Sequence, residues 1–295
     1  MHKIIAFCKW CQDLPIPELA GTLKQLGLDG VDLPCRTGSP IDPTNAPSKL
    51  PEAKKVFEDH GLRIERLSTG LREADTEAER LLEVSRKIGI QKIRIAGYPL
   101  TGPNAGRDPR ELLAEAQRGF ASLGLILEKH GVAGAVQNHA GPTLDVNISS
   151  CLLMLSNCDP QWVGVQYDPG HACLSGEPIE VAVGLLGPYL HTVNVKSPRH
   201  EYSFDPASGR LRYAEVWGPL WDGMLDVPLL LDTLAAAGHT GSLSIHAEYR
   251  SHFHRLSSDM DAVNRLVAED VRYLRALMDG TKDLASRIPY LRNSG

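Results

Sequence analysis

The chain has 295 residues, of which 42% are hydrophobic and 23% charged, a composition typical of a folded globular protein and a length within reach of one α/β barrel. The formal net charge is −5 and no stretch concentrates Lys and Arg, so we do not expect nucleic acid as a partner. The apolar run Ile4–Phe7 is too short for a signal peptide and no stretch approaches ~20 apolar residues, so we expect a cytoplasmic protein with no membrane partner.

Eight short segments rich in Ile and Val recur along the chain and are typical of buried parallel strands. They are Ile4–Cys8, Gly30–Leu33, Arg63–Leu67, Lys92–Ala96, Val132–Gln137, Val163–Tyr167, His191–Val195 and Ser242–Ala247. Their starts mostly lie about thirty residues apart, the length of one strand, one helix and two loops. The predicted fold class is α/β, a single (β/α)8 TIM barrel over residues 1–280, followed by a C-terminal tail over residues 281–295.

Amphipathic stretches between these segments predict the helices of the barrel. They are Pro17–Leu26, Pro47–His60, Glu77–Ile88, Arg110–His130, Ile179–Leu186, Pro228–Ala237 and Asp259–Met278. Several are followed by Gly, as at Gly27 and Gly131, which favours a helix C-terminus. The segments that follow the strands are longer and more polar, so we expect the functional site at the C-terminal ends of the strands.

The six cysteines are too few for a disulfide framework in a chain of this length, and we expect reduced thiols. Cys8 and Cys11 form one C-x-x-C pair. Without a second pair, a structural role is favoured over redox chemistry or a zinc site.

Polar and ionisable residues gather where the later strands are predicted to end. They are Gln137, Asn138, His139, Asp168, His171, Asn194, Lys196, His246 and Glu248. Arg66 lies near the end of the third predicted strand. Because the catalytic groups of a barrel come from the ends of several strands, these side chains are the candidates for one common site.

The motifs Asn138-His139, Asp168-x-x-His171 and Lys196 resemble those of the xylose isomerase-like TIM-barrel superfamily. That superfamily contains sugar isomerases and epimerases, and also the endonuclease IV-type enzymes of AP endonuclease family 2. The resemblance covers nearly the whole chain and implies that four strand-end positions hold one divalent cation. Those positions fall on Gln137, Asp168, Asn194 and His246, of which only Asp168 keeps the residue type of the superfamily.

The resemblance therefore implies a divalent metal (Mn, Zn, Co, Fe or Mg) and no organic cofactor. One carboxylate, two amides and an imidazole should bind such a cation weakly, with a preference for a transition metal. Glu248 follows His246 by two residues and so shares its face of a strand, which makes it the natural replacement ligand.

The chemistry of the superfamily removes a proton next to a carbonyl group. The resemblance implies a sugar isomerase or epimerase that acts on a small keto- or aldo-sugar or on a derivative of one. An amide at position 137 cannot act as a base, so the catalytic candidates are His246, Glu248 and His171. The substrate-binding candidates are His139, Lys196, Trp10 and Arg66.

Other functions stay open. A metal-free sugar-binding or regulatory barrel fits the replaced ligand positions, and a keto-sugar lyase or hydrolase fits because proton abstraction next to a carbonyl also begins an elimination. The endonuclease branch is disfavoured by the amide replacements and by the net charge of −5. The oligomeric state is open as well, with a homo-oligomer as the common case and residues 281–295 as one potential contact.

Bland structural roles compete with these assignments. Asp168-Pro169-Gly170 also fits a turn, and the polar residues fit packing at the mouth of the barrel. The basic residues of the long segment after the seventh strand fit a solvated surface better than a site for phosphate or carboxylate. They are Arg199, His200, Arg210 and Arg212.

Overall fold

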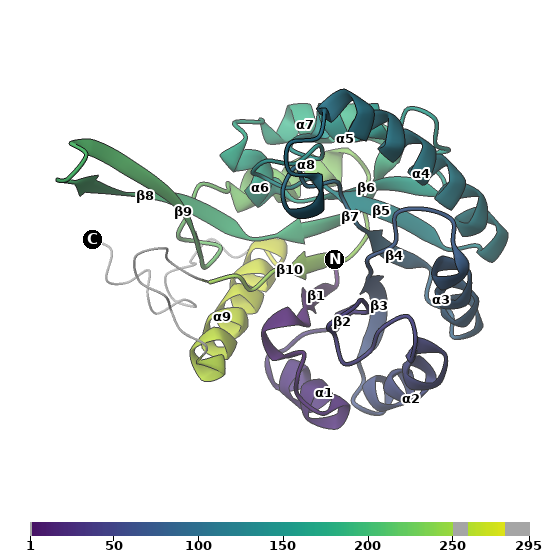
Figure 1. Ribbon diagram of the computed structural model, residues 1–295. Coiled ribbons are helices and arrows are strands. Elements are labelled where there is room, and N and C mark those ends of the chain that lie inside the picture. Colours follow the sequence, from purple (N-terminus) through teal and green to yellow (C-terminus); the bar gives the residue numbers. More distant parts are fainter. Residues whose placement is uncertain (1, 250–258, 281–295) are drawn as a thin grey trace.

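The computed structural model describes residues 2–249 and 259–280, and it shows a closed barrel of eight parallel strands surrounded by helices (Figure 1). The barrel strands are β1 (Ile4–Phe7), β2 (Gly30–Pro34), β3 (Arg63–Ser68), β4 (Lys92–Ile95), β5 (Ala133–Gln137), β6 (Val163–Tyr167), β7 (Leu190–Val195) and β10 (Leu243–Ile245). β1 closes the barrel by pairing with both β2 and β10. The predicted TIM barrel is confirmed, while the predicted tail lies outside the described residues.

The helices that cover the barrel include all seven predicted stretches, each within one residue at either end. The helices are α1 (Ile16–Gln25), α2 (Ala46–Asp59), α3 (Thr76–Lys87), α4 (Pro109–His130), α5 (Ile148–Met154), α6 (Pro169–Leu174), α7 (Ile179–Leu186), α8 (Val227–Ala236) and α9 (Met260–Met278). Local chemistry sets their ends: Asp75 accepts a hydrogen bond from Ala78 at the start of α3, and Gly131 ends α4 with a left-handed φ of 64°.

A twisted antiparallel hairpin interrupts the alternation after β7. β8 (Ser197–Asp205) and β9 (Arg210–Gly218) pair with each other and project away from the barrel (Figure 1). The sequence predicts a long loop here, because charged and aromatic residues alternate and no row of apolar residues marks a face that packs on the core. The short helices α5 and α6 are also absent from the predicted elements.

The last barrel strand is shorter than predicted. β10 ends at Ile245, so that His246 and Glu248 lie beyond the strand rather than inside it. The backbone N–H of Glu248 donates to the carbonyl of His246 at 2.8 Å, which bends the chain tightly between them. The sequence predicts that the two side chains share one face of a strand. In the structure they do not, and they point to different partners.

Polar side chains fill the inside of the barrel toward the C-terminal ends of its strands. Thr192, Asn194 and Lys196 are two residues apart along β7 and its end, so all three face the interior, and all are buried. Gln166 and Asp168 are placed in the same way on β6 and are also buried. The interior is thus a polar site toward this end, while the apolar core lies mainly between strands and helices.

All six cysteines are free thiols, as expected. Cys8 and Cys11 lie buried in a short 3-10 helix after β1, and burial raises the pKa of Cys11 to about 12. The pair is therefore protonated and packed. Within residues 2–249 and 259–280, no helix is both long and apolar enough to cross a bilayer.

Candidate active site

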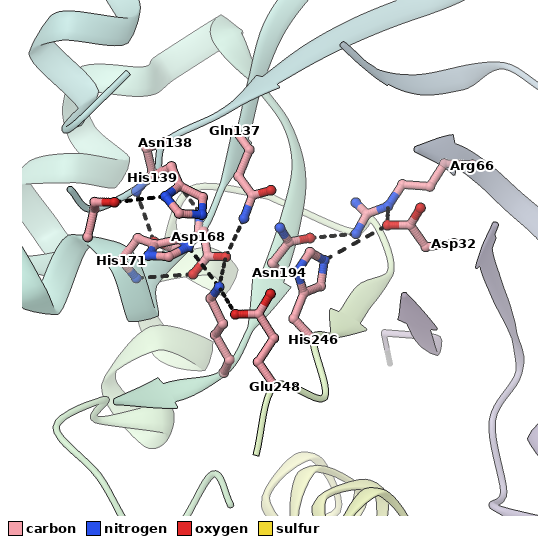
Figure 2. A network of polar contacts seen from close by, with 12 residues as sticks. Asp32, Arg66, Gln137, Asn138, His139, Asp168, His171, Asn194, His246 and Glu248 are labelled. Carbon is pink, nitrogen blue, oxygen red and sulfur yellow. Dashed lines mark hydrogen bonds and ion pairs between the residues drawn. The ribbon is translucent and has the colours of Figure 1, made fainter. Parts of the chain in front are cut away.

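A first polar network joins β2, β3 and β7 inside the barrel (Figure 2). Arg66 and Ser68 are two residues apart on β3 and both donate to Asp32, at 2.6 Å from Nε of Arg66 to Oδ2 and 2.8 Å from Oγ of Ser68 to Oδ1. Nη2 of Arg66 donates to Oδ1 of Asn194 at 2.6 Å. Because Arg66 and Asp32 are fully buried, each compensates a charge that the other would leave unpaired.

His246 reaches this network from the end of β10. Its Nε2 lies 4.0 Å from Oδ2 of Asp32 and has no hydrogen-bond partner in the described part of the chain. Burial lowers the pKa of His246 well below its usual 6.5, and the neighbouring charges of Lys196 and Arg66 lower it further. The imidazole is therefore neutral near pH 7 and keeps a free nitrogen.

Lys196 is the centre of a second network. Its Nζ lies 3.1 Å from Oε2 of Glu248 and 3.6 Å from Oδ2 of Asp168, and it donates to Nε2 of His171 at 2.7 Å. Oδ2 of Asp168 also accepts a hydrogen bond of 2.6 Å from Nε2 of Gln137. Asp168 and Lys196 are buried, whereas 25% of the Glu248 side chain is exposed. Glu248 is thus the carboxylate of this network that a small molecule can reach.

Charge within the second network sets the protonation of its members. Burial opposes ionisation of Glu248, but the charge and hydrogen bond of the Lys196 ammonium outweigh it and lower the pKa of Glu248 to about 2. Burial, the Lys196 charge and His139 lower the pKa of His171 well below 6.5. A neutral His171 that accepts at Nε2 carries its proton on Nδ1, so this ring holds the ammonium in place rather than competing with it.

The indole of Trp217, on β9, covers the Lys196 ammonium. Nζ lies 4.2 Å from the ring centroid, a cation–π distance, and the ring of His171 meets the indole edge-on at 5.0 Å. The root of the β8–β9 hairpin therefore shields the lysine from water.

Asp168 has both a structural and an electrostatic role. Its Oδ1 accepts from the backbone N–H of His171 at 3.1 Å and caps α6, as the turn interpretation predicts. Asn138 fixes its backbone, donating from Nδ2 to the Asp168 carbonyl at 2.9 Å and accepting at Oδ1 from its N–H at 2.7 Å. The second carboxylate oxygen stays directed at Gln137 and Lys196.

A buried pair of side chains, Tyr249 and Asp270, restrains the position of Glu248. The hydroxyl of Tyr249, the next residue, donates to Oδ2 of Asp270 on α9 at 2.6 Å, and Oδ1 of Asp270 accepts from the backbone N–H of Leu220 at 2.8 Å. Burial raises the pKa of Asp270 to about 7. This contact ties the end of β10 to α9 and so limits the positions that Glu248 can take.

The remaining predicted substrate-binding residues differ in their access to the site. His139 is exposed at the mouth, and its ring lies 3.9 Å from that of His171 between centroids. Arg66 is buried beneath the mouth and bonded within the protein. Trp10 donates from Nε1 to Asn264 on α9 at 2.9 Å, a contact that anchors the loop after β1. His139 is therefore well placed for a substrate, while Trp10 and Arg66 have clear structural partners.

Two charged residues of the mouth are missing from the sequence-based candidates. Asp32 lies within the apolar strand β2, and Arg94 lies within β4 between two isoleucines. A charged residue at an inward-facing position of a predicted barrel strand is the signal that identifies both, because such a charge is costly unless it has a function or a partner.

Three of the four predicted metal ligands, Gln137, Asp168 and Asn194, are committed to protein partners, whereas Nε2 of His246 has none among the described residues. Gln137 directs its amide nitrogen at Asp168, and the amide oxygen of Asn194 accepts from Arg66. A divalent cation beside Asp168 would meet the ammonium of Lys196, which already lies 3.6 Å from that carboxylate. Among the described residues, no group of three or more His, Cys, Asp or Glu side chains is placed to hold a metal ion. The metal site stays a prediction that this donor set does not fit.

Comparison with known proteins places the fold in a family. Residues 21–277 match the family model described as xylose isomerase-like TIM barrel. No curated protein matches the chain in sequence.

Several solved structures share the fold at low identity. The 3-keto-D-glucoside 4-epimerase of E. coli superposes with a TM-score of 0.69 at 16% identity, over 94% of this chain and 100% of that one. A D-psicose 3-epimerase, crystallised in the presence of D-fructose, gives 0.70 at 13% identity, over 94% and 99%. A xylose isomerase-like TIM-barrel protein of Mycobacterium smegmatis, in complex with magnesium, gives 0.61 at 19% identity, over 88% and 91%.

Proposed function

Because this chain belongs to the xylose isomerase-like TIM-barrel family, we propose that it is a sugar epimerase or isomerase that moves a proton at the carbon next to a carbonyl group. The similar structures named above include a keto-glucoside epimerase and a ketose epimerase, which supports this class of substrate. The single observation that carries the proposal is the contact of 3.1 Å between Lys196 and Glu248 at the mouth of the barrel. It joins an accessible carboxylate to a fixed positive charge.

This pair provides the two functions that the reaction needs. Removal of the proton requires a base, and the negative charge that develops on the carbonyl oxygen requires a cation or hydrogen-bond donors. Glu248 is the partly exposed carboxylate, and Lys196 is the shielded ammonium beside it. When the carbonyl oxygen of the substrate is bound to Nζ of Lys196, the ammonium would stabilise the negative charge that develops on that oxygen.

Substrate binding also makes Glu248 a better base. In the free site the Lys196 charge keeps the pKa of Glu248 at about 2, too low for efficient proton abstraction near neutral pH. When Nζ turns its hydrogen bonds to the substrate oxygen, that stabilisation of the carboxylate weakens and its pKa rises. The base is therefore activated where the substrate is present.

His246 is the second proton-transfer group in this proposal. Its neutral imidazole has an Nε2 without a hydrogen-bond partner among the described residues, and it follows β10 next to Glu248 (Figure 2). A neutral imidazole has no proton to give to carbon, but its Nε2 can accept the proton of the substrate hydroxyl beside the carbonyl and pass it to the carbonyl oxygen, while Glu248 returns to carbon the proton that it removed. His171, which accepts from Lys196, is a positioning residue and not a base.

No step of this proposal passes through a divalent metal. The positive charge that would polarise the carbonyl comes from the protein itself, because three of the four expected ligands, Gln137, Asp168 and Asn194, are occupied by Arg66, Lys196 and one another. This replaces the metal-assisted reaction that the resemblance implies.

Two of the alternatives lead to different observations. A keto-sugar lyase would begin with the same proton abstraction but expel a neighbouring hydroxyl or glycosyl group. A regulatory barrel would bind sugar without exchange of any proton. The contact between Glu248 and Lys196 favours catalysis, because a binding site has no need of a base next to a carbonyl-polarising cation.

The test is proton exchange in heavy water. Keto-sugars, including ketohexoses, 3-keto-glucosides and their phosphate and uronate derivatives, are incubated with the protein and followed by proton NMR for loss of the signal next to the carbonyl. We expect exchange with wild type and with Glu128→Gln, a surface control on α4, and at least a roughly hundredfold slower exchange with Glu248→Gln. Exchange that is equally fast in Glu248→Gln, or binding of a panel member without exchange, would contradict the proposal.

A further inference from the structure

A cavity of about 490 Å³ opens at the C-terminal ends of β2 to β5, next to the Lys196 network. His139 lines it and its ring also contacts that of His171, so the cavity and the proposed reaction centre share a wall. The volume fits a small molecule such as a monosaccharide derivative.

Three arginines from three different strand ends line this cavity. Arg36 follows β2, Arg72 follows β3 and Arg94 lies on β4. The carboxylate in the lining is that of Asp145. Three positive charges and one negative charge leave an excess of 3 − 1 = 2 positive charges around the cavity.

Among the described residues, no carboxylate forms an ion pair with any of the three arginines. Nε of Arg94 is buried and makes no hydrogen bond. The Arg36 guanidinium lies over the ring of Phe7, 5.5 Å from its centroid, and Nε of Arg72 donates to a backbone carbonyl, that of Gly97, at 2.9 Å. Arg36 and Arg94 are half-buried and Arg72 is exposed, so Arg36 and Arg94 are the two guanidinium groups that lose contact with water without gaining a carboxylate or phosphate partner.

Asp145 does not supply that charge. Its Oδ1 accepts from the backbone N–H of Tyr98 at 3.0 Å and from the hydroxyl of Thr143, and its carboxylate packs against the Cα of Gly97, where a Cβ would lie 2.5 Å away. No ion pair links it to an arginine within the described residues. Its hydrogen bonds hold the loop after β5 against the loop after β4.

The charges of Arg36 and Arg94 act on each other. Burial lowers the pKa of Arg94 and the charge of Arg36 lowers it further, while the more weakly acting carboxylates Asp32, Asp145 and Glu248 raise it. By contrast, two arginines of the projecting hairpin are paired, Arg199 with Asp222 and Arg212 with Asp205. The arginines of the cavity thus lack the ion pairs that these two hairpin arginines make.

We propose that this cavity binds an anionic group, a carboxylate or a phosphate, on the substrate whose keto carbon reaches Lys196 and Glu248. The inference rests on the proposed function for the identity of the ligand as a sugar, and it adds that the sugar is acidic. Arg94 and Arg36 bind the oxyanion, and Arg72 completes the rim. Neutral sugars leave the cavity with its excess positive charge unpaired.

The proposal is tested by isothermal titration calorimetry at constant ionic strength, with inorganic phosphate, D-glucuronate and D-glucose as the probes. We expect phosphate, D-glucuronate or both to bind, and D-glucose not to bind at the same concentrations. Binding of phosphate alone identifies a phosphate site, and binding of D-glucuronate alone identifies a carboxylate site. The affinity should fall at least roughly tenfold in Arg94→Gln and recover in part in Arg94→Lys, because each charged hydrogen bond contributes strongly to oxyanion binding.

Two controls separate this result from folding and from the reaction. Arg86→Gln, a surface arginine on α3, should bind as wild type does, and Arg36→Gln provides a second variant should Arg94→Gln fold poorly. Glu248→Gln should still bind the anion, so a failure of proton exchange and a failure of anion binding are distinguishable. Absence of binding of both anions, or equal binding by wild type and Arg94→Gln, would overturn the proposal.

Discussion

Nη2 of Arg66 donates to the amide oxygen of Asn194 at 2.6 Å, across the inside of the barrel from β3 to β7. In the superfamily pattern, position 194 is a metal-ligand position. Here its oxygen is bound to a guanidinium whose Nε also donates to Asp32. The positive charge of Arg66 thus lies next to Asn194, where the resemblance implies the positive charge of a metal ion.

Removal of the Asp32 charge should destabilise the fold. In Asp32→Asn the Arg66 guanidinium stays buried without a counter-charge, and the loss of one partner of a buried ion pair costs about 3–5 kcal/mol. Urea denaturation followed by circular dichroism should show a reduction of that order in the free energy of unfolding. Glu83→Gln, which removes the exposed pair with Lys87 on α3, is the matched control and should change it far less. Equal effects of the two substitutions would show that the buried pair does not hold the barrel.

Glu248→Gln should affect the rate of the reaction more than substrate affinity. The amide keeps the size of the side chain but cannot accept a proton, so kcat should fall by about 10²- to 10⁴-fold while KM changes little. Steady-state kinetics with a substrate identified by the exchange assay measure both constants. A fall in affinity with unchanged kcat would instead make Glu248 a binding residue.

The pH profile of kcat/KM should show its acid limb below pH 6.5. Activity requires unprotonated His246 and Glu248; burial lowers the pKa of His246 well below 6.5, and that of Glu248 is about 2. Protonation of either group removes a base, so activity falls as the pH falls through these values and stays constant from about pH 6.5 to 8. An acid limb with its midpoint above pH 6.5 would contradict the assigned environment of His246.

Asp270 should make the protein less stable as the pH rises from about 4 to 7. Burial raises its pKa from 3.8 to about 7 in the folded state, so the folded protein binds a proton over this range that the unfolded chain has released. The stabilisation is complete below the unfolded pKa and is lost as the pH passes the folded pKa, by an amount on the order of a few kcal/mol.

Thermal unfolding at a series of pH values measures this effect. Asp270→Asn, which can still accept from Leu220, should remove much of the decline, whereas Asp232→Asn on α8 should keep it. An unchanged decline in Asp270→Asn would assign the pH dependence to other groups.

The barrel is predictable from the sequence because its signals are local and repeated. Short apolar strands, amphipathic helices and Gly at helix ends recur about every thirty residues, and each of the seven predicted helices is then located within one residue. The β8–β9 hairpin is missed, since its strands stand away from the barrel and bury no continuous apolar stripe. Charged and aromatic residues alternate along these two exposed strands, and in sequence this pattern resembles a polar loop.

The site is predictable as a set of residues but not as a set of contacts. The strand-end positions correctly bring Asp168, Lys196 and Glu248 together. The hydrogen-bond partners of Gln137 and Asn194 depend on side-chain orientation, which sequence periodicity does not determine. The arginine cavity joins residues from three strand ends separated by tens of residues, and only the closed barrel brings them together.

Proton exchange by metal-stripped protein is the most direct test of a reaction that uses the charge of Lys196. The protein is treated with a chelator, verified free of manganese, iron, cobalt and zinc by elemental analysis, and assayed in heavy water with a substrate that wild type exchanges. We predict the same exchange rate, within about twofold, before and after stripping and after addition of magnesium or manganese, because the polarising charge is part of the chain. Exchange that disappears on stripping and returns with a divalent cation would contradict a reaction driven by Lys196 and restore a metal-assisted one.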